Sequence, residues 1–307
     1  MKINSQNVLD SPNNNTIFLV FNFKKDAAVN EAFKNLCQLI SNLNNSANTR
    51  FPNAKASVVL GISFDAWQLL QLPAPMPKEF ETFTPIAGTK HTAVATRGDL
   101  HLHIRSDMYS FCIDAAAAIS DTLSAVAVVE QEVHGFRYWD SRSILGFVDG
   151  TENPQGADRA YFGLIGDEDP RYKGGSYLFV QKYIHNLEAW KALGVGEQER
   201  VIGRSKVDDI EMPDGIKPAN AHSALANIGD DLKIVRDNMS FGNVATNEMG
   251  TYFIAYASSF ITVKKMLTNM FVGVPEGNYD RILDFSTAQT GTLFFVPTFE
   301  MLDDFAG

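Results

Sequence analysis

The sequence predicts an α+β fold in which antiparallel sheets carry helices on one face. In the first 134 residues, four short runs rich in β-forming residues alternate with two helix-like segments. Their order is strand, helix, strand, strand, helix, strand, which is the split βαβ pattern of a ferredoxin-like domain. Elements of similar type and order recur after residue 135. We therefore predict two ferredoxin-like domains, covering residues 1–134 and 135–307.

The first domain is predicted from runs of apolar, β-branched and aromatic residues. Such runs cover 16–23, 57–63, 99–105 and 125–133. One predicted helix follows Asp26, a suitable N-cap, and has an apolar face at three- and four-residue steps; the other covers 107–123. In 99–105, His101 and His103 alternate with apolar residues. We interpret them as the polar face of a half-buried strand, with metal ligation as the weaker alternative.

The second domain lacks one strand in its pattern. Strands are predicted at 176–183, 251–257 and 292–297, and helices at 186–193 and 260–271. An irregular stretch, 201–239, lies where the second strand is expected. Irregular stretches longer than about 15 residues are usually functional or disordered in compact domains. Because this one is neither low in complexity nor highly charged, we expect it to carry function.

Composition excludes several classes of protein. The chain has 307 residues and a formal net charge of −10, which argues against nucleic acid and anionic membranes as partners. No apolar run approaches the ~18 residues of a spanning helix, and the first residues lack a secretory signal. Cys37 and Cys112 lie in helix-like patterns and are interpreted as buried free thiols. These features predict a cytoplasmic protein.

Two of the candidate functional residues stand in turn-like or irregular segments. Asp149 is bracketed by glycines in 146–154, so its carboxylate could project rigidly from a turn and move protons, or could simply cap that turn. His222 lies in the long irregular stretch. A lone histidine is most often structural or exposed, yet a single histidine is sufficient as an axial ligand of haem iron.

Three more candidates are charged or amide-bearing residues. Arg236 and Asn238 point the same way in an extended segment, where a cation and an amide donor suit developing negative charge; an ordinary surface arginine paired with Asp237 is the alternative. Asp284, in an apolar tripeptide, could hold an imidazole or could be a cap. Arg204 could bind a carboxylate or face solvent.

Together these segments resemble the dye-decolourising (DyP-type) peroxidases, and within them the intracellular bacterial group called class B. The resemblance spans nearly the whole chain, and all five segments occur in the family's order. They are GFVDGTENP at 146–154, ERVIGRSK at 199–206, His222, RDN at 236–238 and LDF at 283–285. No glycine-rich nucleotide-binding motif competes with this interpretation.

The resemblance implies one haem b per chain, held by the second domain. It assigns roles to six positions of this sequence: His222 as the iron ligand, Asp284 as the carboxylate bonded to that histidine, Asp149, Arg236 and Asn238 on the peroxide side, and Arg204 near a haem propionate. The implied activity is reduction of hydrogen peroxide through a ferryl intermediate, with oxidation of dyes, phenols or similar one-electron donors.

The resemblance also implies a homo-oligomer. Some relatives carry a C-terminal extension that directs them into an encapsulin shell, and we expect none after the last predicted strand. Two alternatives remain open: a haem-binding protein that handles haem or releases its iron, and a ferredoxin-like module that binds a ligand without chemistry. Asp149 and Arg236 favour catalysis, since storage needs neither. A module without chemistry would purify colourless.

Overall fold

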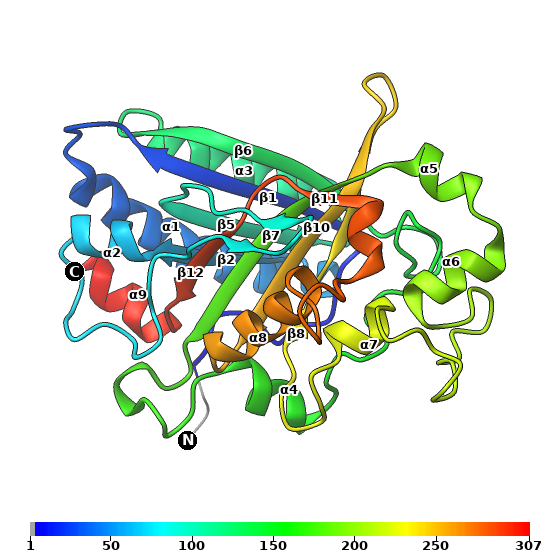
Figure 1. The fold of residues 1–307 in the computed structure, drawn as a ribbon. Helices are drawn as coiled ribbons and strands as arrows, with labels where there is room; N and C mark the ends of the chain where they lie inside the picture. The colour runs from blue at the N-terminus through cyan, green and yellow to red at the C-terminus, as the bar shows by residue number, and fades with distance from the viewer. Residues whose placement is uncertain (1–3) are drawn as a thin grey trace.

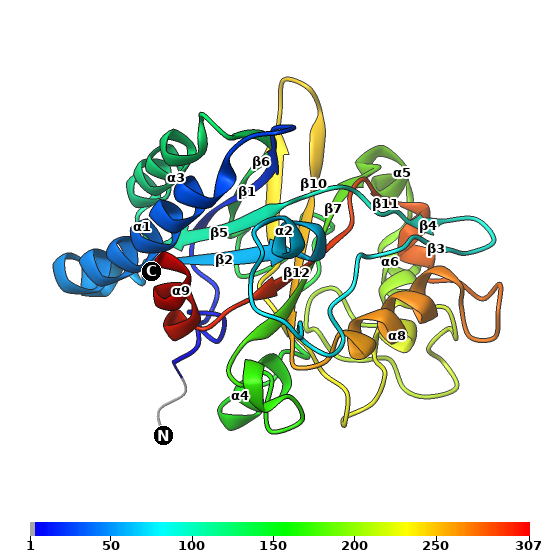
Figure 2. The ribbon, with the colours of Figure 1, turned by 90° about the vertical axis from the view of Figure 1, so that its left-hand side faces the viewer.

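The computed structural model describes residues 4–307 and contains the two predicted sheets. The first consists of β1 (Asn15–Phe23), β2 (Ser57–Ser63), β5 (Leu100–Ser106) and β6 (Ala127–Phe136), in the spatial order β2–β5–β1–β6. Helices α1 (Val29–Arg50) and α3 (Tyr109–Leu123) cover one face of it (Figure 2). The ferredoxin-like order predicted for this half is confirmed. β6 runs past residue 134, and the domain boundary placed there stays a prediction.

The second sheet repeats the arrangement. It consists of β7 (Ser176–His185), β9 (Met239–Asn243), β10 (Glu248–Ala257) and β12 (Thr292–Val296), in the order β12–β7–β10–β9. The strand missing from the sequence pattern is β9, which follows directly after the irregular stretch. Helices α5 (Leu187–Ala192) and α6 (Val195–Ile202) follow β7, and α8 (Phe260–Phe271) follows β10.

The two sheets join into a closed ring of strands. β12 pairs with β2, β9 pairs with β6, and β7 pairs with β10 as well as with β12. Figure 1 shows the strands of both halves running together through the middle of the molecule. The two-residue β8 (Val235–Arg236) pairs with β10, and β11 (Ser286–Ala288) pairs with β7.

The remaining elements are short and lie around the sheets. They are η1 (Pro52–Ala54), α2 (Phe64–Leu69), β3 (Ile86–Ala87), β4 (Thr92–Ala93), α4 (Ala157–Gly163), η2 (Pro170–Tyr172), α7 (His222–Ala226), η3 (Arg281–Asp284) and α9 (Phe299–Ala306).

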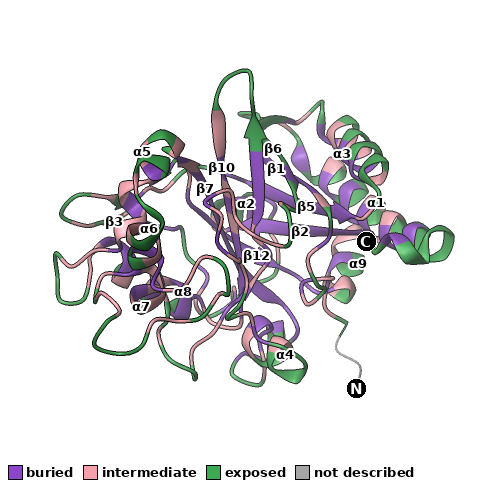
Figure 3. Ribbon diagram, turned by 90° about the vertical axis from the view of Figure 1, so that its right-hand side faces the viewer, coloured by how far each residue is buried: buried purple, intermediate pink, exposed green. Residues whose placement is uncertain are grey.

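Ring closure buries both faces of several strands, as the purple strands of Figure 3 show. In β5, the apolar residues belong to the core under the helices, and His101, His103 and Arg105 are fully buried on the opposite face. The prediction of a half-buried strand is therefore wrong, because the second sheet covers the polar face. His101 Nε2 is 3.2 Å from the Tyr252 hydroxyl, and burial lowers the pKa of His101 to about 3. Among residues 4–307, no group of three or more His, Cys, Asp or Glu could hold a metal ion.

The cysteine prediction is confirmed. Cys37 and Cys112 are free and buried, and burial raises the pKa of each thiol to about 12. Across the part of the chain that the structure describes, no helix has the length and apolar character needed to cross a membrane.

Candidate active site

Two adjoining pockets that share Asp149, His222 and Arg236 form a cavity beside the second sheet, between that sheet and helices α7 and α8. Strands β7 and β10 supply Tyr183 and Phe253, and α8 supplies Met266, Leu267 and Met270, so this wall is mainly apolar. The irregular stretch between α6 and β8 supplies much of the remaining lining, which agrees with the functional role expected for it.

His222 is the first residue of α7 and faces this cavity. Its Nδ1 lies 2.7 Å from Oδ2 of Asp280, whose side chain is fully buried. The other carboxylate oxygen of Asp280 accepts a hydrogen bond from the backbone N–H of Ile282, at the start of η3. A carboxylate accepts this hydrogen bond when the imidazole carries its proton on Nδ1. The unprotonated Nε2 is then the ring nitrogen available to bind a metal ion.

Asp284, predicted to hold His222, does not contact it. Its carboxylate accepts hydrogen bonds from Lys90, His91 and Tyr279 instead. Partial burial would raise the pKa of Asp284, but the hydrogen bonds from Lys90 and His91 outweigh it and hold that pKa below its ordinary value. The prediction is wrong because Asp284 ends η3, whereas Asp280 precedes it and caps it. The two carboxylates therefore have different surroundings.

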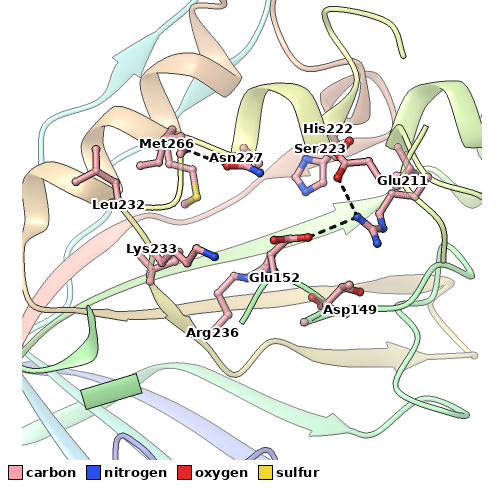
Figure 4. A pocket seen from close by; sticks show the side chains of 18 of the residues that line it. Asp149, Glu152, Glu211, His222, Ser223, Asn227, Leu232, Lys233, Arg236 and Met266 are labelled. Carbon is pink, nitrogen blue, oxygen red and sulfur yellow. Dashed lines mark hydrogen bonds and ion pairs between the residues drawn. The ribbon is translucent and has the colours of Figure 1, made fainter. Parts of the chain in front are cut away.

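Asp149 lies on the opposite side of the cavity from His222 (Figure 4). Its turn is formed by Gly146 and Gly150, which both have a φ of 91°, a conformation that residues with a Cβ rarely adopt. The Nδ2 of Asn238 lies 3.2 and 3.3 Å from the two carboxylate oxygens of Asp149. Asn238 is held in turn, because its Oδ1 accepts the backbone N–H of Ile254 in β10. Two predicted site residues, 89 positions apart in the chain, thus make direct contact.

Arg236 lines the same side of the cavity as Asp149 (Figure 4). Its backbone is held by Asn153, whose side chain accepts from the Arg236 N–H at 2.8 Å and donates to its carbonyl at 2.7 Å. Its guanidinium makes no hydrogen bond or ion pair with any residue in 4–307. The cavity therefore contains a cation that is fixed at its backbone and free to bind an anion.

Arg204 also lines the cavity, but it is surrounded by carboxylates. Its Nε is 2.7 Å from Asp209, and its Nη1 is 3.6 Å from both Glu152 and Glu211. Lys233, which the sequence did not single out, adds a third cation to the lining, after Arg236 and Arg204, and lies 3.2 Å from the exposed Asp230. The placement of Arg204 beside a haem propionate stays a prediction.

Sequence reasoning missed Asp280 and Asn153. A signal for Asp280 existed, since an Asp directly before a short helical segment is a typical N-cap and is rigidly held. Asn153 gave no comparable signal, because its two hydrogen bonds join segments 83 residues apart.

Family models identify both halves of the chain. The model described as Dyp-type peroxidase, N-terminal, matches residues 6–137, and the model described as Dyp-type peroxidase, C-terminal, matches residues 140–301. A dye-decolorizing peroxidase of Rhodococcus erythropolis is 49% identical over 94% of this chain and 85% of its own length. One from Mycobacterium tuberculosis is 48% identical over 94% of this chain and 86% of its own.

Solved structures agree with that result. A dye-decolorizing peroxidase from Bacteroides thetaiotaomicron superimposes with a TM-score of 0.97 at 48% identity, covering 100% of this chain and 99% of that one. A variant of Rhodococcus jostii DypB in complex with heme has a TM-score of 0.91 at 42% identity, covering 99% of each chain. This chain belongs to the Dyp-type peroxidase family.

Proposed function

We propose that this chain is a haem-dependent peroxidase in which His222 ligates the haem iron and Asp149, Arg236 and Asn238 face hydrogen peroxide. The observation that carries the proposal is the pairing of His222 with a fully buried carboxylate on one side of the cavity, opposite an Arg236 guanidinium that has no partner in residues 4–307. Relatives of this chain solved in complex with heme support the same cofactor.

The residues present fit a haem. The mainly apolar wall formed by Phe253, Met266 and Met270 suits the faces of a macrocycle. Lys233 supplies positive charge to the same cavity, with which a haem propionate could pair. His222 leaves one ring nitrogen for the iron, which is the ligand number a haem requires. When bound, the haem supplies the iron that receives peroxide and stores its two oxidising equivalents.

Asp280 acts through His222. By accepting the imidazole N–H it fixes the ring orientation, and the partial negative charge it induces makes Nε2 a stronger electron donor. When haem is bound, such a donor would favour high oxidation states of the iron, which peroxidase chemistry needs. Asp280 is thus a positioning residue that also tunes the iron.

Asp149 and Arg236 act on peroxide itself. The Asp149 carboxylate can take a proton from one oxygen of hydrogen peroxide and return it to the other, which would leave as water while the bound haem supplied the two electrons. Asn238, whose amide donates to Asp149, holds the carboxylate in place for both transfers. The Arg236 guanidinium stabilises the negative charge that develops on the leaving oxygen. Storage or release of haem would need neither group.

Small one-electron donors such as dyes and phenols are the proposed reducing substrates, supported by relatives named for dye decolorization. A cytoplasmic location is supported by two free, buried cysteines, since thiols stay reduced there. A homo-oligomer is proposed from the resemblance alone, and light scattering of the purified protein tests it.

An absorption spectrum tests the proposed function most directly. The purified protein should show the intense haem band of a histidine-ligated ferric iron, and hydrogen peroxide should shift that band within the mixing time of a stopped-flow instrument. A reducing dye should then restore the first spectrum. A protein that stays colourless after incubation with haem contradicts the proposal. A coloured protein whose band peroxide leaves unchanged favours haem handling instead.

A further inference from the structure

The residue between Arg236 and Asn238 points away from the cavity. Asp237 is 1% exposed and lies inside the ring of strands. There its Oδ2 accepts a hydrogen bond from Nη1 of Arg105, a residue of β5 in the first sheet. Arg236, Asp237 and Asn238 thus alternate across the ring wall, with the middle side chain inward and the outer two in the cavity lining.

Arg105 is rigidly held on every side. It is completely buried, its Nε donates to Ser57 Oγ at 3.1 Å, and its Nη2 donates to the carbonyl of Asn7. Burial alone would lower its pKa, but the charge and hydrogen bond of Asp237, together with Asp10 at 3.9 Å, outweigh burial and hold the pKa of Arg105 above its ordinary value. His103, whose Nε2 is 3.6 Å from Asp237, has a pKa lowered by burial and by Arg105, so it stays neutral. Arg105 is therefore the cation that is hydrogen-bonded to Asp237, and Arg159 adds a weaker charge from farther away.

The backbone around Asp237 has little support of its own. β8 ends at Arg236 and β9 begins at Met239, so residues 237 and 238 lie between strands. The Asp237 N–H reaches the Ile254 carbonyl at a long 3.3 Å. Each residue of the tripeptide is instead tied by a side-chain hydrogen bond: Asn153 binds the backbone of Arg236, Arg105 binds Asp237, and Asn238 binds Ile254 and Asp149.

We propose that Arg105 is a positioning residue of the peroxide side: by holding Asp237 inside the ring, it sets the directions in which Arg236 and Asn238 face the cavity. The roles of Arg236 and Asn238 rest on the proposed function, whereas the positioning itself is a property of the protein without haem. The first sheet thus acts on the cavity beside α7 and α8, whose lining begins only at residue 143.

The decisive variant removes both charges, Arg105→Met with Asp237→Leu. Either single change leaves an uncompensated buried charge and can unfold the protein, whereas replacing a whole buried ion pair by apolar residues is often neutral for stability. A purely structural role predicts that the double variant, once folded, behaves as the unmodified protein does. The proposal predicts a folded protein whose cavity cation is misplaced.

Two measurements separate these outcomes. In haem-free protein, backbone hydrogen exchange over residues 235–239 should be about tenfold faster or more in the double variant, because that segment loses an anchor. In haem-loaded ferric protein, the affinity for fluoride should fall about tenfold or more, close to that of Arg236→Leu, because an anion on the iron loses its charge-assisted hydrogen bond. Exchange and fluoride affinity equal to those of the unmodified protein, with an unchanged melting temperature, would overturn the proposal.

Tyr252→Phe is the matched control. Its hydroxyl pairs with His101 in the same ring interior, and its loss leaves Arg105 and Asp237 untouched. Exchange over 235–239 and fluoride affinity should stay the same; a change as large as that of the double variant would mean general loosening and would also refute the proposal. Should the double variant not fold, Arg105→Lys keeps the positive charge without the planar fork. It should still weaken fluoride binding, and unchanged binding there counts against the proposal.

The role of Arg105 can be tested even if the protein binds no haem. If the unmodified protein takes up no haem, the proposed function fails, and hydrogen exchange in the haem-free protein still decides the role of Arg105.

Discussion

The two sides of the cavity are built in opposite ways. On the α7 side, one short hydrogen bond joins His222 to Asp280, and both residues stand at the start of short helices of the second half of the chain. On the other side, Asp149 and Asn238 are joined through their side chains at 3.2 Å. The Arg236 guanidinium has no partner among residues 4–307, and Arg236 is held instead through its backbone by Asn153 and through its neighbour, the buried Asp237. The proposed iron ligand, His222, is therefore held through its side chain, whereas the proposed peroxide-side Arg236 is held through its backbone.

The largest effect on either side of the cavity is expected from removing the imidazole of His222. His222→Ala should lose most of its bound haem, because the remaining contacts are apolar walls and a few cations. Haem content per chain, measured by absorbance after desalting, checks this. A variant that keeps a normal histidine-ligated spectrum would show that the iron ligand lies elsewhere.

On the opposite side, Arg236→Leu should retain haem and slow the reaction with peroxide by about 10²–10³-fold, as removal of an electrostatic donor typically does. We expect Asp149→Ala to slow it less, because water can replace a proton carrier in part and replaces a fixed cation poorly.

Stopped-flow mixing of each variant with peroxide, followed at the haem band, measures both rates. A larger loss in Asp149→Ala reverses the ranking, and normal rates in both variants remove these residues from the reaction.

A smaller effect is expected from Asp280, the hydrogen-bond partner of the His222 imidazole. Asp280→Asn should keep haem but raise the reduction potential of the iron, because His222 loses its anionic partner; loss of such partners typically costs 10–100-fold in metal affinity or activity. Spectroscopic redox titration measures the shift. Asp284→Asn is the control, since Asp284 binds Lys90, His91 and Tyr279 and leaves His222 alone. Equal shifts in the two variants would contradict the assignment of Asp280.

Unlike His222, His101 lies in the interior of the ring of strands, and its burial there predicts a pH dependence of stability. Burial lowers the pKa of His101 to about 3, while in the unfolded chain it takes up a proton near pH 6.5. Between these values the unfolded state binds more protons, so the free energy of unfolding should fall as pH falls, by up to about 1.4 kcal/mol per pH unit from this residue.

Urea unfolding of haem-free protein at pH 7, 6 and 5 measures this dependence. His101→Leu should have a shallower pH dependence by up to one proton, and an unchanged slope would mean that His101 already carries its proton when folded.

Local pattern predicted the first sheet well, because each strand there is a short apolar run of its own. It missed β9, whose five residues, Met239–Asn243, include Gly242 and are held by β10, the next strand in the chain, and by β6 in the first half. It also placed His101 on a solvent-facing surface, since alternation shows two faces and cannot show what covers each. Ring closure, which decides that, depends on pairings between the halves.

The same limit applies within the site. The segments that carry Asp149, Arg236 and Asn238 were recognisable by type and order, and the structure brings all three to one side of the cavity. The sequence could not show that Asp280, and not Asp284, is the partner of His222. The two carboxylates are four residues apart, and that spacing does not indicate which of them is buried beside the imidazole.

The closed ring has a consequence for how the chain is made. During synthesis the strands of the first sheet leave the ribosome before β9 and β12. In the finished molecule β9 pairs with β6 and β12 pairs with β2, the two outer strands of the first sheet. Until then those two strands present unpaired backbone groups, the kind of edge that joins other chains into aggregates. The nascent first half therefore exposes two sheet edges that the finished molecule covers, and aggregation through them competes with folding until the second half has been made.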